Sequence, residues 1–178
     1  LFIAAAGDTS LYPAIVAHAA AGLSTAVVYA TAPHRGSEFP VMPPGQQLRA
    51  AAIRAGAGGV TILSDFSSLV LDDEAQNKTV EDILADWSTR LDTPVEPVLL
   101  QQLAAAIRQY RPTVLVVGPD GEGPTGTSAE NRLIARLAQK AAAQAADAES
   151  IPALSRANLL PHKVDRIYVG LPENSRYT

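Results

Sequence analysis

Polar side chains that could carry chemistry gather in three short segments of an otherwise apolar chain: residues 7–10, 31–45 and 118–126. Each segment directly follows a run of apolar residues that predicts a buried strand. When such strands run parallel, ligands bind past their carboxyl ends. We therefore expect the three segments to border one crevice, which makes their residues the first candidates for a functional site.

Asp8, in the first segment, is the leading candidate for a catalytic residue. A carboxylate at the end of a strand could bind a metal ion or act as a general base. Asp8, Thr9 and Ser10 are also the residue types that cap helix N-termini. The alternative interpretation is therefore structural, with Asp8 or a neighbour starting the next helix.

The glycine-rich segment 118–126 carries two carboxylates, Asp120 and Glu122. It lacks the Lys-Ser/Thr pair of a phosphate-binding P-loop, and its negative charges would repel a phosphate. One interpretation is a loop that faces a sugar or a metal ion, with Asp120 binding the ligand. The other is a flexible loop whose carboxylates are solvated.

The second segment is followed by a cationic residue, Arg49, which lies just inside the helix predicted after residues 31–45. Its guanidinium could bind hydroxyl groups or an anion. Solvated surface charge is the alternative for Arg49. His34, within the segment, is a further candidate for binding a ligand. Of the other two histidines, His18 is expected to be packed or solvated rather than a ligand, and His162 to be structural.

Strands that alternate with helices position these segments, and the pattern predicts a three-layer α/β/α sandwich with a mainly parallel, Rossmann-like sheet. The apolar runs 1–6 and 113–117 lack alternation and should be adjacent, central strands. Residues 64–93 are polar, and we expect an excursion over the sheet edge, outside the core, with one or two helical turns at 80–87. The predicted strands cover residues 1–6, 24–30, 60–63, 113–117 and 164–169, and the other predicted helices cover 11–22, 46–55, 94–110 and 128–146.

Composition limits the classes of function. The chain has 178 residues, of which 47% are hydrophobic and 18% charged, enough for one domain over residues 1–178 with a buried core. No run approaches about 18 uninterrupted apolar residues, so no membrane span is expected. A net charge of −4 and an isoelectric point near 5.3 provide no basic surface for a nucleic acid.

Cysteine is absent from the sequence, which excludes disulfides, thiolate zinc sites and a cysteine nucleophile. The absence of cysteine does not decide the cellular compartment of the protein. We expect the cytoplasm, and secretion is the alternative. Because the chain starts at Leu1, without Met and directly in a predicted strand, we expect that something upstream has been removed. The sequence indicates no oligomeric state.

Four stretches, in order and at similar spacing, resemble the PIG-L/LmbE family of zinc-dependent N-deacetylases, which remove acetyl groups from N-acetylglucosamine conjugates. Residues 2–31 resemble that family's first strand, motif, helix and second strand. Residues 107–116 match its Arg-Pro entry into a central strand. Residues 47–52 are similar to its Leu-Arg helix, and residues 161–168 to its closing Pro-His/Trp-x-Val pattern. The likeness runs nearly end to end and implies a deacetylase-like fold.

The zinc-binding motifs of that family are not retained. Its first motif is Ala-His-Pro-Asp-Asp-Glu, in which the His and the second Asp bind zinc and the first Asp is the general base. Here Asp8 falls on the general-base position, whereas Ala6 and Thr9 replace the two ligands. The second motif, His-Pro-Asp-His, supplies the remaining zinc histidine, and residues 123–130 contain no histidine. Asp8, alone or with Glu122 or Glu130, would be a poor zinc site.

Two functions follow from the resemblance. The first is a catalytically degenerate domain, a pseudoenzyme that needs no cofactor and serves as a carbohydrate-binding or interaction module. The alternative is an active zinc-dependent N-deacetylase with a rearranged metal site. All three histidines are then candidate ligands, and His34 is the most plausible because its segment borders the crevice. The expected partner in both cases is a small molecule or a sugar conjugate. The residues predicted to surround it are Asp8, His34, Arg49 and Asp120.

Overall fold

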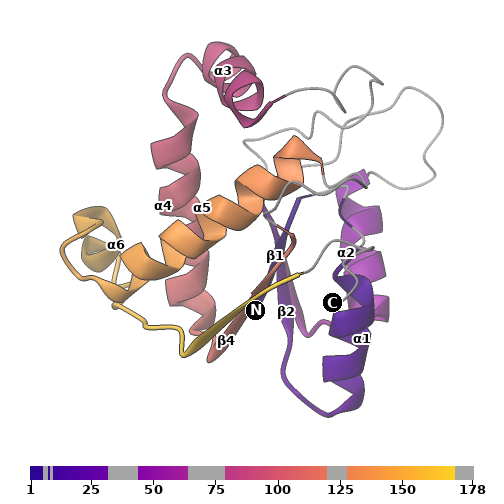
Figure 1. Cartoon of the computed structure of the whole chain (residues 1–178). Coiled ribbons are helices and arrows are strands. Elements are labelled where there is room, and N and C mark those ends of the chain that lie inside the picture. The colour runs from indigo at the N-terminus through magenta and orange to yellow at the C-terminus, as the bar shows by residue number, and fades with distance from the viewer. Residues whose placement is uncertain (6–7, 9, 32–43, 64–78, 120–127, 171–178) are drawn as a thin grey trace, which may run out of the picture.

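A five-stranded parallel sheet forms the centre of the molecule (Figure 1). The computed structural model of the chain describes residues 1–5, 8, 10–31, 44–63, 79–119 and 128–170. Within them the strand order is β3-β2-β1-β4-β5, and each neighbouring pair is parallel. The strands are β1 (Phe2–Ala4), β2 (Ala26–Tyr29), β3 (Gly59–Ile62), β4 (Val114–Val117) and β5 (Arg166–Val169).

Strand β1 is central, as its uninterrupted apolar sequence predicts. Ile3 is in register with Val28 of β2 and with Val117 of β4. All three residues of β1 are buried. The predicted adjacency of the first and fourth strands is therefore confirmed. Because β2 and β4 both run parallel to β1, the carboxyl ends of these strands lie on the same edge of the sheet.

Helices cover both faces of the sheet and complete the predicted three-layer α/β/α sandwich (Figure 1). Phe2 and Tyr29 pack with residues of α1 and α2 on one face. Ile3 and Val28 belong to the core that α4 and α5 share on the other face. The helices are α1 (Tyr12–Ala20), α2 (Pro44–Arg54), α3 (Val80–Leu91), α4 (Val95–Tyr110), α5 (Ala129–Ala146) and α6 (Pro152–Arg156). None of the helices in the described ranges is long and apolar enough to cross a membrane.

Two helix boundaries follow the local rules of the sequence. Gly22 follows α1 with a φ of +74°, in the left-handed region where glycine is favoured, and its N–H donates to the Ala19 carbonyl. Ser128 precedes α5, and its hydroxyl oxygen accepts from the N–H of Asn131 at 3.1 Å. Both were predicted as the end and the start of these helices, and both are confirmed.

Helix α3 corrects the prediction that residues 64–93 lie outside the core. Ile83 and Trp87 are each 2% exposed and belong to the same apolar core as α4 and α5. These two residues, four apart, form the buried stripe of the helix, and Val80 and Leu84 pack beside them. The prediction was wrong because the polar and acidic residues of 64–93 outweighed this short apolar stripe in the composition. The expected excursion stays a prediction for residues 64–78, which lie outside the described residues.

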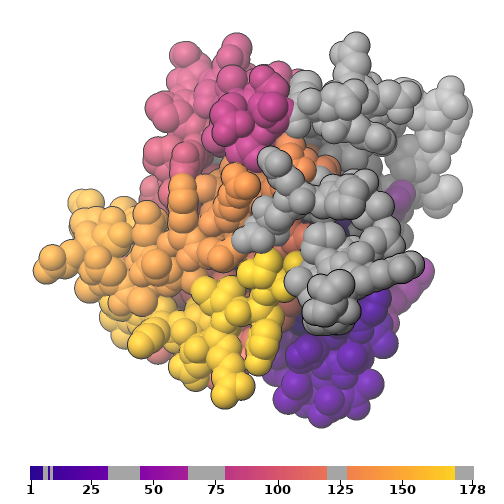
Figure 2. Space-filling model, in the orientation of Figure 1, coloured from indigo at the N-terminus to yellow at the C-terminus, as the bar shows by residue number. Residues whose placement is uncertain are grey.

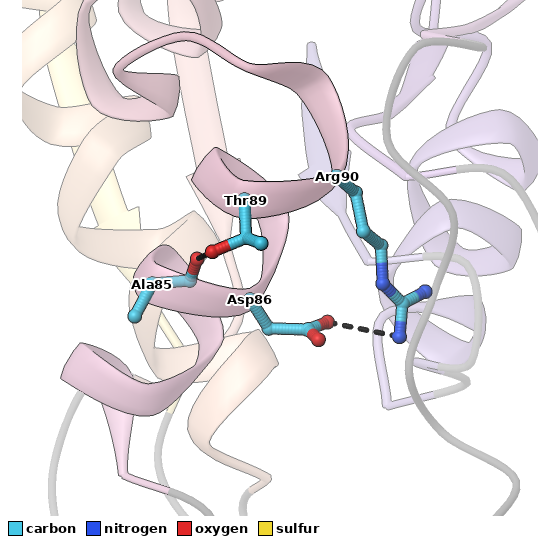
Figure 3. A network of polar contacts seen from close by, with 4 residues as sticks. All are labelled: Ala85, Asp86, Thr89 and Arg90. Atoms are coloured by element: carbon cyan, nitrogen blue, oxygen red, sulfur yellow. Dashed lines mark hydrogen bonds and ion pairs between the residues drawn. The ribbon is translucent and has the colours of Figure 1, made fainter.

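Polar contacts stabilise α3 from within. Thr79 and Asp82 form a capping box at its start, each side chain accepting a hydrogen bond from the other residue's backbone N–H. One turn later, an ion pair joins Arg90 to Asp86 at 3.0 Å, and the Thr89 hydroxyl donates to the Ala85 carbonyl (Figure 3). The helix is therefore locally stabilised in addition to its two core anchors.

A buried arginine joins the helices on the α4–α5 face. Arg108 of α4 is 2% exposed, and its guanidinium donates to backbone carbonyls at the end of α5. These include Ala145 at 3.1 Å from Nε and Asp147 at 2.6 Å. Another guanidinium nitrogen reaches the Leu159 carbonyl, 3.1 Å away, beyond α6. Carbonyls at a helix end have no partner within the helix, so one cation satisfies several of them at once.

The segment between α5 and β5 contains a short helix that the sequence did not predict. Pro152 occupies the first turn of α6, and Leu154 of this helix is buried in the α4–α5 core. Strand β5 then forms an edge of the sheet, with Ile167 and Tyr168 exposed. Figure 2 shows the yellow end of the chain, which includes β5, at the molecular surface.

Replacing Arg108 with methionine should lower the free energy of unfolding by about 3 kcal/mol. Methionine keeps the apolar stem but leaves the buried carbonyls of Ala145, Asp147 and Leu159 without their donor. Urea denaturation measures the change. Arg136→Ala, at an exposed position of α5, is the control and should change stability by less than about 0.5 kcal/mol. Equal effects of the two substitutions would contradict this role of Arg108.

Candidate functional site

The carboxyl edge of the sheet brings together residues that follow three different strands. Asp8 comes after β1, Thr31 after β2 and Gly118 after β4. Two contacts described below, between Asp8 and Gly118 and between Thr31 and Glu130, cross from one strand end to another. The origins of the three predicted loops therefore meet on one edge of the sheet.

Asp8 is buried at this edge, with 7% of its surface exposed. Its Oδ1 accepts a hydrogen bond from the N–H of Ser10 at 2.9 Å, and its own N–H donates to the Ala5 carbonyl at 3.1 Å. The residue that precedes α1 is Leu11, which makes no side-chain cap. The interpretation of Asp8 as a helix cap is therefore wrong, because its carboxylate closes the turn before the helix.

A glycine makes room for this carboxylate. A Cβ atom on Gly118 would lie 2.8 Å from Oδ2 of Asp8, closer than real Cβ contacts allow. The end of β4 can thus approach Asp8 only because position 118 has no side chain. The predicted proximity of the first and third segments holds at the points where they begin.

Two tyrosines line a narrow hollow together with Asp8, between α1 and the sheet. The hydroxyl oxygens of Tyr12 and Tyr29 lie 2.8 Å apart in a hydrogen bond. Tyr29 is 1% exposed, whereas Tyr12 is half-buried. The pKa of Tyr29 is raised well above its ordinary value, first by burial, then by Tyr12 and by the negative charge of Asp8. Both phenols were absent from the predicted site.

A second polar pair lies at the same edge, on the side of α5. The Thr31 hydroxyl donates to Oε1 of Glu130 at 2.8 Å, and both side chains are buried. Glu130 lies in the first turn of α5, where the helix dipole favours a negative charge. The pair joins the end of β2 to the start of α5, across 99 residues of sequence.

The remaining predicted site residues are not brought to Asp8 by any described contact. Arg49 is exposed in the middle of α2. His34, Asp120 and Glu122 lie outside the described residues. Their roles therefore stay predictions.

The two other histidines have structural roles, as expected. His18 donates from Nδ1 to the Ala14 carbonyl at 2.7 Å, one turn earlier in α1, and its ring meets the edge of Phe2. His162 donates from Nε2 to the Pro112 carbonyl at 2.8 Å, just before β4 begins. Pro112 is at the amino end of that strand, so His162 lies at the edge opposite to Asp8.

The described residues around Asp8 do not fit a zinc ion. Catalytic zinc takes about three protein ligands, chosen from histidine, cysteine and carboxylate side chains. The polar groups that share the hollow with Asp8 are the phenols of Tyr12 and Tyr29. Within the described ranges, no three side chains of histidine, cysteine, aspartate or glutamate are grouped so that they could hold a metal.

A larger cavity lies away from this edge. It has a volume of about 560 Å³ and is bordered by α6, the start of α4 and the end of α5. Leu100 and Ile151 form apolar parts of its lining, and Glu96 and Arg156 charged parts. The hollow beside Asp8 has no room even for a water molecule, so a ligand can approach it only from outside. Size alone would therefore point to the α4–α6 cavity, whereas the convergence of polar groups points to the carboxyl edge.

The sequence matches no protein-family model and no curated protein. Solved structures nevertheless share its architecture. The conserved protein TT1542 from Thermus thermophilus superposes with a TM-score of 0.62 at 19% identity, over 99% of this chain and 67% of that one. N,N′-diacetylchitobiose deacetylase from Pyrococcus horikoshii, in complex with its inhibitor MPG, gives a TM-score of 0.66 at 13% identity, over 99% and 61%. The chain has a PIG-L/LmbE-like fold.

A protein with a different reaction is also similar to this chain. The 4-carboxy-2-hydroxymuconate hydratase GalB from Pseudomonas putida gives a TM-score of 0.52 at 19% identity, over 84% of this chain and 57% of that one. A hydratase and a deacetylase thus resemble the same chain, so the fold alone does not decide the reaction. The chain spans 57% to 67% of the lengths of the three structures.

Replacing Gly118 with alanine should destabilise the protein by about 1–3 kcal/mol, because the new methyl group collides with the Asp8 carboxylate. Gly45→Ala is the matched control: the nearest atom to its Cβ is 3.6 Å away, and alanine favours helix α2. Thermal denaturation of both variants measures the difference. A Gly118→Ala variant as stable as Gly45→Ala would show that the end of β4 does not depend on this close approach.

The raised pKa of Tyr29 predicts a loss of stability in alkaline solution. The unfolded phenol ionises near pH 10, about the ordinary tyrosine value, while the folded one stays protonated. The contribution of the protonated Tyr29 phenol to the free energy of unfolding is thus complete below pH 10, and it decreases as the pH rises above 10. When the pH is raised from 9 to 11, the melting temperature of the Tyr29→Phe variant should fall less than that of the wild type. Parallel pH profiles of the two proteins would contradict the prediction.

Proposed function

We propose that this chain is a carbohydrate-binding domain with a deacetylase-like fold, and that it lacks the metal-dependent hydrolysis that zinc would support. One observation carries the proposal: phenols, rather than imidazoles, share the hollow of the Asp8 carboxylate. Without a metal ion, a water molecule near Asp8 keeps the high pKa of bulk water, and Asp8 has no activated nucleophile to deprotonate. A carboxylate and hydroxyl groups are instead well suited to bind the hydroxyls of a sugar.

The ligand class is supported by a similar structure. The Pyrococcus horikoshii protein is a deacetylase of N,N′-diacetylchitobiose and is in complex with an inhibitor. Its fold extends over 99% of this chain, including the strand ends that surround Asp8. A disaccharide of N-acetylglucosamine is therefore the first ligand to test.

Each proposed residue has a defined role toward the ligand. Asp8 accepts a hydrogen bond from a sugar hydroxyl at the rim of the hollow. Arg49, exposed on α2, donates to hydroxyls or to an anionic group. Asp120 and His34, in the segments that follow β4 and β2, add further hydrogen bonds to the same ligand.

Asp8→Asn should weaken the binding of N,N′-diacetylchitobiose about tenfold, because a hydrogen bond to a charged group contributes roughly 1.5–3 kcal/mol. Arg49→Ala should have an effect of similar size. Isothermal titration calorimetry measures the affinities, with melting temperatures recorded in parallel. Asp165→Asn and Arg54→Ala are the controls, since both residues are exposed and Arg54 lies in the same helix as Arg49. Affinities that stay at the wild-type value would contradict these roles.

Metal content separates the proposal from an active enzyme. The purified protein should contain no stoichiometric zinc by elemental analysis and should release no acetate from N,N′-diacetylchitobiose. One equivalent of zinc together with acetate release would contradict the proposal. That result would support the active N-deacetylase, in which Asp8 is the general base and His34 a zinc ligand.

A further inference from the structure

The two phenols beside Asp8 have two hydroxyl protons but share one hydrogen bond. Either Tyr29 donates to Tyr12 or Tyr12 donates to Tyr29. In each arrangement one proton is used between the rings, and the other must find a different acceptor. The tyrosine whose hydroxyl proton is not used between the rings is the one that can donate a hydrogen bond to a ligand.

Burial favours one of these arrangements. Tyr29 is 1% exposed, and Tyr12 is its one hydrogen-bond partner among the described residues. If Tyr12 were the donor, the proton of Tyr29 would be buried without an acceptor, which is costly. If Tyr29 is the donor, the proton of Tyr12 points away from the pair. Tyr12 is half-buried at the start of α1, so this residue, unlike Tyr29, retains contact with solvent.

We infer that Tyr12 is a ligand-binding residue of this site, and that Tyr29 positions its hydroxyl group as an outward hydrogen-bond donor. Tyr12 and Asp8 then offer a donor and an acceptor along the same hollow. A sugar is complementary to this pair, because its hydroxyl groups can accept from Tyr12 and donate to Asp8. The hydrogen bond received from Tyr29 also makes the Tyr12 hydroxyl a better donor.

This inference rests on the proposed function, since it names the group that selects a hydroxylated ligand. Tyr12→Phe removes one hydroxyl and should weaken the binding of N,N′-diacetylchitobiose about fivefold, the loss expected for one neutral hydrogen bond. Tyr29→Phe should weaken binding less, about twofold. The double variant should bind as Tyr12→Phe does, because Tyr29 acts through Tyr12 alone.

Tyr110→Phe is the matched control. Its hydroxyl is also hydrogen-bonded, to Thr61 at 2.7 Å, but it comes from the end of α4, which leads into the amino end of β4. This variant should bind the disaccharide as the wild type does. A Tyr110→Phe effect as large as that of Tyr12→Phe would assign the loss to general stability and contradict the inference.

A second measurement uses the wild-type sequence and does not depend on how the variants fold. With 3-fluorotyrosine in place of tyrosine, the fluorine signal of Tyr12 should shift when the disaccharide is added, while that of Tyr110 stays unchanged. If the wild type binds the disaccharide and Tyr12 neither shifts nor affects affinity, the inference is wrong and the proposed function stands. If the wild type does not bind it at all, the proposed function fails, and the role of Tyr12 with it.

Discussion

Strand β1 lies between β2 and β4, with Ile3 in register with Val28 on one side and Val117 on the other. Both faces of β1 are buried, and a strand this apolar is buried on both faces only in the middle of the sheet. Because the neighbouring strands are parallel, their carboxyl ends meet where Asp8 follows β1. The meeting of Asp8 with Gly118 and the position of Tyr29 beside them depend on this single placement.

The α4–α5 face is held by a different interaction, at the far end of the molecule from Asp8. Arg108 satisfies carbonyls that the end of α5 would otherwise leave buried and unpaired. His162 reinforces the same region, since its N–H donates to Ala145 and its ring to Pro112. These contacts lie at the opposite edge of the sheet from Asp8, so Arg108 variants test stability apart from the proposed ligand site. Because Tyr29, Thr31 and Glu130 are buried at the carboxyl edge, affinities of variants there are read together with their melting temperatures.

The sequence predicted the parts of the fold that short-range patterns encode. Strand β1, the glycine that ends α1 and the serine that starts α5 all follow from neighbouring residues. It did not predict contacts between distant residues, such as Thr31 with Glu130, because neither residue type indicates a buried partner 99 residues away. Arg108 was missed for a related reason: an arginine suggests the surface, and only the end of α5 explains its burial. Asp8 was placed correctly at a strand end, but its alternative role as a helix cap was wrong, since Leu11 is the residue that directly precedes α1 and Asp8 accepts from Ser10 before the helix begins.

In the part of the chain that the structure describes, two surfaces compete as the ligand site: the carboxyl edge with its converging polar groups, and the larger cavity between α4 and α6. Mapping backbone amide shifts by NMR during a titration with N,N′-diacetylchitobiose distinguishes them directly. If the disaccharide binds at the carboxyl edge, the largest shifts will fall on residues 8–12, 29–31 and 118. Shifts confined to residues 96–101 and 150–156, or no shifts at all, would contradict a carbohydrate site built around Asp8.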